Sequence, residues 1–150
     1  MTPIAYFKLQ AKNLHSDIKT QFFSDEKGLL DYKPRFFDVN GIVVDYDLDE
    51  KDQKFKTLGK AQWIIALILG LKSWNDLIQS DPVTLELYKL MFEHQNEIPP
   101  YEWDSLFILR DLDGKMIDLG TPKERLEYYK VLLGESEEEL QEGNGYLLQD

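Results

Sequence analysis

Hydrophobic residues near the amino terminus recur at helical spacing. Five of them fall on one helix face because they follow one another at steps of three or four residues: Phe7, Ala11, Leu14, Ile18 and Phe22. Thr2 is of a type that commonly caps helices, and Pro3 suits a first turn, where its missing N–H needs no partner. The pattern predicts a helix over residues 3–22 and places Asp17 away from its apolar face.

The most apolar part of the chain is the segment 57–80. Thr57 is a predicted N-cap, and the residues after it leave little polar surface, so we expect this helix to be buried on most sides. Gly70 is predicted to end the helix in the left-handed conformation, and Ser73 to cap a second, shorter helix. The segment therefore predicts two consecutive helices joined by a tight turn.

Two further helices are predicted in the second half of the chain. One starts after Asp81 and runs to about residue 96, ahead of two consecutive prolines. The other has a capping box, with Thr121 as the cap and Glu124 three residues later. It is predicted to cover residues 122–133 and to end at Gly134.

Two segments carry signals for strands. Residues 36–46 are rich in aromatic and β-branched side chains, so they predict a strand segment. Asn40-Gly41 is a type I′ turn pair, which leaves a small hairpin with very short arms as an option. Residues 101–119 carry competing signals, because a proline at a first turn favours a helix whereas Asp113-Gly114 between apolar runs favours a hairpin. Both alternatives stay open for the second segment.

These elements predict a mainly α fold. We expect a compact helical domain of about five to seven helices, with a small β-hairpin as an option. The domain is predicted to cover residues 1–142, and the glycines near residue 143 to release a tail over residues 143–150.

The charge of the chain is strongly acidic. Asp and Glu number 28 against 17 Lys and Arg, which gives a formal net charge of −11. Direct binding to nucleic acid is disfavoured, because neutralising phosphates requires clustered basic residues. The charge instead predicts a protein partner with a basic surface.

Few residues suit nucleophilic or metal chemistry. The chain has no cysteine and only two histidines, His15 and His94. Zinc needs three or four ligands at short spacing, and here the adjacent pair Glu93-His94 on one predicted helix has no partner motif. His15 is interpreted as a surface or boundary residue. We predict no catalytic residue, no metal ligand and no cofactor.

One acidic segment opens like a calcium-binding loop. Asp45, Asp47 and Asp49 alternate as calcium ligands do. The sixth position is Glu50, where the sharp turn of such a loop needs glycine, and the twelfth is Lys56, where a bidentate glutamate is needed. The segment is therefore interpreted as an acidic linker.

Two acidic clusters and one tryptophan are the candidate contacts with a partner. Clusters 45–52 and 135–142 most often mean a solvated face, and their functional alternative is a surface for a basic partner. Trp103 is predicted to be core, although an exposed side chain there would be a suitable anchor. The candidate contact residues are Asp45, Asp47, Asp49, Glu50, Trp103, Glu137, Glu138 and Glu139.

The first residues of the chain lack the basic start and apolar core of a secretory signal, so we expect a cytoplasmic location. The longest apolar run, residues 63–71, is far shorter than the roughly 20 residues that cross a bilayer as a helix. No membrane segment is predicted.

Residues 58–77 follow the pattern L-x-x-A-Q-x-x-I-A-x-x-x-G-x-x-x-W-x-D-L. This resembles a helical signature of small uncharacterised bacterial proteins and, more remotely, a helical segment of glyoxalase-related bacterial domains. The stretches 6–14 and 36–38 also resemble the former group. The resemblance implies kinship without a transferable activity, since the glyoxalase metal site uses histidines and strands that this sequence does not offer.

The functional expectation is a non-enzymatic bacterial interaction module whose helical scaffold presents acidic surface to a protein partner. A narrower version is an immunity protein, an antitoxin or a phage-type inhibitor that imitates nucleic-acid charge. The alternatives are an enzyme that uses carboxylates without metal or cysteine, and a structural or regulatory subunit.

Overall fold

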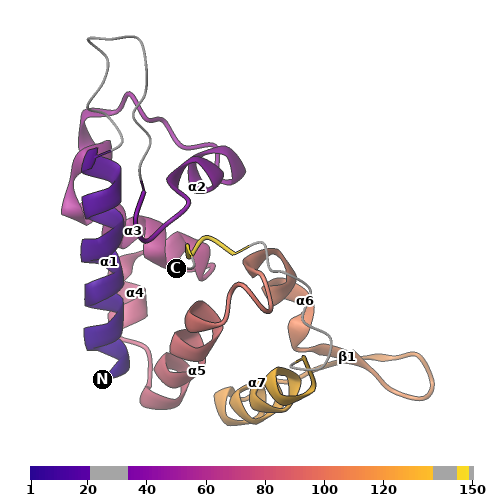
Figure 1. Cartoon of the computed structure of the whole chain (residues 1–150). Coiled ribbons are helices and arrows are strands. Elements are labelled where there is room, and N and C mark those ends of the chain that lie inside the picture. The colour runs from indigo at the N-terminus through magenta and orange to yellow at the C-terminus, as the bar shows by residue number, and fades with distance from the viewer. Residues whose placement is uncertain (21–33, 137–144, 149–150) are drawn as a thin grey trace. The chain divides into compact units, whose positions relative to one another are not determined.

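The computed structural model describes residues 1–20, 34–136 and 145–148 (Figure 1). Within these ranges the chain forms seven α-helices and one two-stranded antiparallel hairpin. The predicted mainly α fold with a small hairpin is therefore confirmed. No helix in the described ranges is long and apolar enough to cross a membrane.

The contacts within the chain divide it into two compact units. The first unit comprises Met1–Leu77 together with Tyr146–Asp150, and the second comprises Ile78–Gly145. The expected single domain over residues 1–142 stays a prediction, and residues 146–148 of the expected tail pack within the first unit.

The first unit is built on helix α1 (Pro3–Thr20), which packs against α3 (Leu58–Ile68). Thr2 Oγ1 accepts a hydrogen bond from the Ala5 N–H at 3.2 Å, as expected of an N-cap. The predicted apolar face is confirmed, since Phe7, Ala11, Leu14 and Ile18 are all buried. Phe22, the last residue of that face, lies outside the described residues.

Asp17 contradicts the sequence interpretation of α1, because it is buried beside the apolar face. Its carboxylate accepts hydrogen bonds from three consecutive backbone N–H groups, those of Arg35, Phe36 and Phe37, at 2.8–2.9 Å. Three donors satisfy a charge that would otherwise be costly to bury. Asp17 thus fixes the path of the chain where it enters the next helix.

The strand segment predicted over residues 36–46, with its optional hairpin, is wrong, because Val39–Asp45 forms helix α2. Asp38 Oδ1 accepts a hydrogen bond from the Gly41 N–H at 3.1 Å and so caps this helix. Its buried residues Val39, Ile42 and Val43 follow a helical spacing. Capping and burial therefore outweigh the strand propensity of the valines.

The central helical segment agrees with its prediction. Thr57 Oγ1 caps α3 by accepting from the Lys60 N–H at 3.1 Å, and Gly70 adopts a φ of 80° after the helix ends. Ser73 then caps α4 (Trp74–Ile78) through the Asp76 N–H. Ahead of α3, the 3-10 helix η2 (Gln53–Lys56) buries Phe55 completely.

The second unit pairs helix α5 (Pro82–Glu93) with α7 (Pro122–Ser136). Both begin as predicted, with Asp81 and Thr121 as caps. Helix α7 does not end at Gly134 as predicted but runs to Ser136. Gly134 therefore lies inside the helix, where glycine is unfavourable but tolerated.

Both alternatives for residues 101–119 are present in succession. The 3-10 helix η3 (Pro100–Glu102) and helix α6 (Trp103–Leu106) come first. Strands β1 (Ile108–Arg110) and β2 (Met116–Asp118) then form the hairpin, with Ile108 opposite Asp118. Gly114 in its turn has a φ of 79°, which only glycine adopts readily.

Candidate functional site

The acidic segment 45–52 begins at the last residue of α2 and ends just before η2. Asp45, Asp47 and Asp49 are exposed, and Glu50 is half-buried. Asp45 Oδ2 accepts a hydrogen bond from the Tyr146 hydroxyl at 2.8 Å, and Asp49 Oδ1 accepts from a backbone N–H two residues later. Two of these carboxylates therefore help to hold the loop, while Asp47 lies at its surface.

Tyr146 is buried against this segment. Burial raises the pKa of its hydroxyl above the ordinary value, and the hydrogen bond to Asp45 raises the pKa further. The hydroxyl therefore stays protonated and acts as a hydrogen-bond donor. Its function here is to join the end of the described chain to α2.

The charges of the first unit nearly cancel. Twelve acidic and eleven basic residues fall within Met1–Leu77 and Tyr146–Asp150. Four of the lysines, Lys51, Lys54, Lys56 and Lys60, lie within or close behind the acidic segment. At physiological salt, interactions between exposed charges are largely screened beyond about 8 Å, so lysines close to the acidic segment offset its charge more than distant ones do.

The net charge of the chain is concentrated in the second unit. Ile78–Gly145 contains sixteen acidic and six basic residues, a net charge of −10, against −1 for the first unit. Three of the six basic residues are paired with acids: Lys89 with Glu93, Lys130 with Glu86, and Arg125 with Asp118. The negative charge evident from the composition therefore belongs mainly to this unit.

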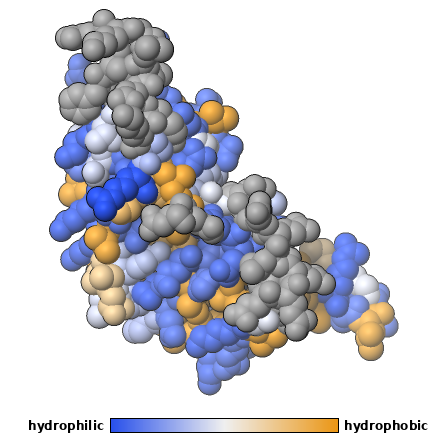
Figure 2. Space-filling model, viewed as in Figure 1, coloured by the Kyte–Doolittle hydropathy of each residue, from blue (hydrophilic) through white to orange (hydrophobic). Residues whose placement is uncertain are grey.

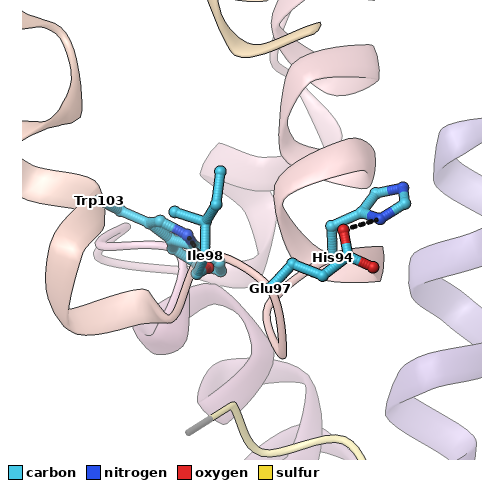
Figure 3. Close-up of polar contacts among 4 residues, drawn as sticks. All are labelled: His94, Glu97, Ile98 and Trp103. Atoms are coloured by element: carbon cyan, nitrogen blue, oxygen red, sulfur yellow. Dashed lines mark hydrogen bonds and ion pairs between the residues drawn. The ribbon is translucent and has the colours of Figure 1, made fainter. Parts of the chain in front are cut away.

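The remaining predicted contact residues divide into two groups. Glu137, Glu138 and Glu139 lie outside the described residues. Trp103 is 6% exposed, and its indole N–H donates to the Ile98 carbonyl at 3.0 Å (Figure 3). The prediction that Trp103 is core is confirmed, and its alternative as an exposed anchor does not hold.

The two histidines have local partners. His94 Nδ1 lies 2.9 Å from Glu97 Oε2, and Figure 3 shows the two side chains turned toward each other. His15 is half-buried, and its Nε2 lies 2.8 Å from the Lys56 carbonyl oxygen. No group of three or more His, Cys, Asp or Glu residues in the described ranges could hold a metal ion.

The β1–β2 hairpin carries the densest group of exposed apolar side chains in the described part of the second unit. Ile108, Met116 and Ile117 are 40%, 60% and 44% exposed, and Leu112 near the turn is fully exposed. Figure 2 shows hydrophobic and hydrophilic surface side by side over the hairpin. Single exposed apolar residues are ordinary, whereas a group of them on one small element indicates a contact surface.

The base of this hairpin is anchored to α7 by Arg125. Its guanidinium lies 3.0 Å from Asp118 Oδ1, donates through Nε to the Leu119 carbonyl, and lies 5.2 Å from the centre of the Phe107 ring. Phe107 is buried and contacts Tyr128 edge to face. The hairpin is therefore held at its base while its turn contacts solvent.

Tyr129 is a buried polar residue in the core of the second unit. Its side chain is fully buried, and in the part of the chain that the structure describes its hydroxyl has no hydrogen-bond partner. Burial raises the pKa of this hydroxyl, and the negative charge of Glu97 raises it further. The hydroxyl is consequently neutral and unsatisfied.

Sequence reasoning did not single out the hairpin as a contact surface. The signal was present, because Leu112, Met116 and Ile117 surround the predicted Asp113-Gly114 turn. A pairing of two short strands buries neither face by itself. What could not be derived was whether another element covers these side chains.

Comparison with known proteins gives no relative: the chain matches no protein-family model, no curated protein and no solved structure.

Proposed function

We propose that this chain is a protein-binding module whose second unit, Ile78–Gly145, binds a partner with a basic surface. The observation that carries the proposal is the net charge of −10 on this unit beside a nearly neutral first unit. Complementary charge speeds encounter and disfavours partners of the same sign.

The acids of the second unit are accessible. Glu102 and Asp104 are exposed on η3 and α6, and Glu124 and Glu127 are exposed on the first turns of α7. Among the described residues, none of these four acids forms an ion pair. The paired acids there are Glu86, Glu93, Glu97 and Asp118. A partner can therefore approach these four carboxylates without displacing an internal contact.

The test compares two variants that remove the same number of charges. The first carries E102Q, D104N, E124Q and E127Q in the second unit, and its matched control carries D47N, D49N, E50Q and D52N in the first. Proteins that the intact chain captures from the native host are eluted with increasing salt. Their binding to the intact chain and to each variant is then measured. We expect the second-unit variant to weaken binding by about tenfold or more and to flatten its salt dependence.

Equal losses in the two variants would place the contact on the predicted segment 45–52 as well. Undiminished binding by the second-unit variant would contradict the proposal. Recovery of no salt-sensitive partner would also contradict it, because charge would then not select a partner.

In its narrower form the module is an immunity protein, an antitoxin or an inhibitor that occupies a nucleic-acid-binding site on its partner. What supports this form is the excess of carboxylates, whose charge resembles that of a phosphate backbone. Duplex DNA and the chain would then compete for the captured partner. Simultaneous binding of both would contradict the narrower form and leave the broader one intact.

A further inference from the structure

We propose that the outer edge of strand β2 (Met116–Asp118) receives an extended segment of the partner, with alternating basic and apolar residues, as an added strand. This inference rests on the proposed function and names the element and the chemistry of the contact. Strand addition to an exposed sheet edge is a recurrent mode of peptide recognition.

Among the described residues, no backbone partner is present for the hydrogen-bonding groups along this edge of the hairpin. The Asp111 N–H donates to the Lys115 carbonyl, and the Leu119 N–H donates to the Phe107 carbonyl, both at 2.9 Å. Residue pairs in an antiparallel ladder alternate between bonded and non-bonded, so Met116 and Asp118 belong to non-bonded pairs. Their N–H and C=O groups point away from β1.

The side chains of β2 are also accessible to an added strand. All three residues of β2 are exposed, whereas Leu109 in the middle of β1 is half-buried. Met116 and Ile117 lie on opposite faces of the strand because successive side chains alternate. An added strand would therefore find one apolar contact on each face of the sheet.

Natural proteins usually protect such an edge. Short strands and charged side chains are common protections, and this edge ends in Asp118. That carboxylate, however, is drawn to Arg125 at the base of the hairpin. The other two residues of the strand, Met116 and Ile117, are uncharged. This edge therefore combines accessible backbone groups with apolar side chains.

The net charge of the second unit favours a basic partner segment over a second copy of the chain. A second copy of the chain would bring another unit of net charge −10 to the same edge, and like charges disfavour that pairing. The hairpin itself carries three acids and two bases between Ile108 and Asp118. Asp118 is paired with Arg125, so an incoming strand with basic residues gains mainly from the net charge of the unit.

The experiment uses the full chain and a displayed library of random peptides as the probe. Selected peptides are measured against M116P and M116T. Both variants remove the methionine side chain, but only proline removes the outward N–H, and edge strands tolerate proline at such a position. We expect selected peptides to combine basic and apolar residues and to bind M116P about tenfold more weakly than M116T.

A second readout does not depend on the proline variant folding. In the unsubstituted chain, a bound peptide should slow the hydrogen exchange of the Met116 and Asp118 amides, because both become donors to the added strand. The exposed Val131 on α7 provides a matched apolar control, V131T, which should leave peptide binding unchanged.

The outcomes separate the two proposals. Peptides that need Glu102, Asp104, Glu124 and Glu127 but bind M116P and M116T equally, with no slowed exchange at β2, would overturn strand addition and leave the proposed function standing. Basic peptides that ignore those four acids yet slow exchange at β2 would support the strand contact and contradict charge selection by the unit. Selection of acidic peptides, or of none, would overturn both.

Discussion

The Arg125 guanidinium on α7 and the Asp118 carboxylate at the end of β2 lie 3.0 Å apart, and this pair joins the hairpin to the helical part of its unit. The same guanidinium also contacts the Leu119 carbonyl and the Phe107 ring. A two-stranded hairpin is marginal on its own in water. Its orientation therefore depends on contacts at its base.

Replacing Arg125 should loosen the hairpin more than it destabilises the chain. We expect R125A to lower the free energy of unfolding by about 1 kcal/mol, because the ion pair is partly exposed and such pairs contribute little. Hydrogen exchange of the hairpin amides should accelerate while that of α5 and α7 stays near normal. The control is K130A, which removes a longer ion pair, with Glu86 at 3.6 Å, whose basic side chain is more exposed than that of Arg125. Unchanged exchange in the hairpin of R125A would contradict the anchoring function.

Asp17 should be among the most sensitive polar residues of the first unit. In D17N the amide group presents an N–H group toward three backbone N–H donors, so at least one donor loses its acceptor. We expect the free energy of unfolding to fall by roughly 3 kcal/mol in urea denaturation. The matched control D47N changes an exposed residue with a φ of 50°, a conformation that asparagine also tolerates. A loss in D17N no larger than that in D47N would show that the buried carboxylate is not required.

Tyr146 should make stability depend on alkaline pH. Its pKa is raised above 10.0, so the folded chain keeps a proton that the unfolded chain releases. Stability should therefore be intact below about pH 10 and fall by up to about 1.4 kcal/mol per pH unit above it. In Y146F this fall should be shallower, and at neutral pH the variant should be about 1 kcal/mol less stable because Asp45 loses its donor. Parallel pH profiles of the two chains would contradict the assignment.

Tyr129 should behave in the opposite way at neutral pH, because its hydroxyl is buried and has no hydrogen-bond partner among the described residues. Removing that oxygen in Y129F removes an unsatisfied group, so we expect stability at pH 7 to be unchanged or to rise by about 1 kcal/mol. Thermal or urea unfolding beside Y146F provides the comparison. A clear loss of stability in Y129F would mean that the hydroxyl has a partner such as an ordered water.

Two glycines should respond differently to alanine. A Cβ at Gly145 would lie 2.5 Å from the Gln95 carbonyl oxygen, so G145A forces the backbone at residue 145 away from the backbone at Gln95. We expect it to lower the free energy of unfolding by about 1–3 kcal/mol. A Cβ at Gly134 meets nothing within 4 Å, and G134A should stabilise helix α7 by about 0.5–1 kcal/mol. Equal effects on unfolding in urea would contradict the close approach at Gly145.

Local signals in the sequence predicted the fold well where they agreed with one another. Caps at Thr2, Thr57, Asp81 and Thr121 were each followed by a helix. The prediction for residues 36–46 was wrong because strand propensity and a turn pair were given more weight than the helical spacing of Val39, Ile42 and Val43. Propensity is the weaker signal when an N-cap precedes it.

Other features depended on contacts between distant segments and could not be derived locally. Asp17 is buried because residues 35–37 supply its donors, which a helix periodicity does not reveal. The acidic net charge was evident from the composition. Its concentration in the second unit could be recognised only from the unit boundary at Ile78, which follows from contacts in the structure. The contacts predicted at Asp47, Asp49 and Glu50 stay predictions.

The pairing of residues 36–38 with residues 146–148 also constrains how the chain can be made. The Asp38 N–H donates to the Tyr146 carbonyl, Phe37 bridges to Leu147, and the Leu148 N–H donates to the Phe36 carbonyl. While a ribosome is still synthesising the second unit, the first unit lacks these partners. The first unit therefore cannot complete its fold, and its backbone groups near α2 cannot form these hydrogen bonds, until residues 146–148 leave the ribosome.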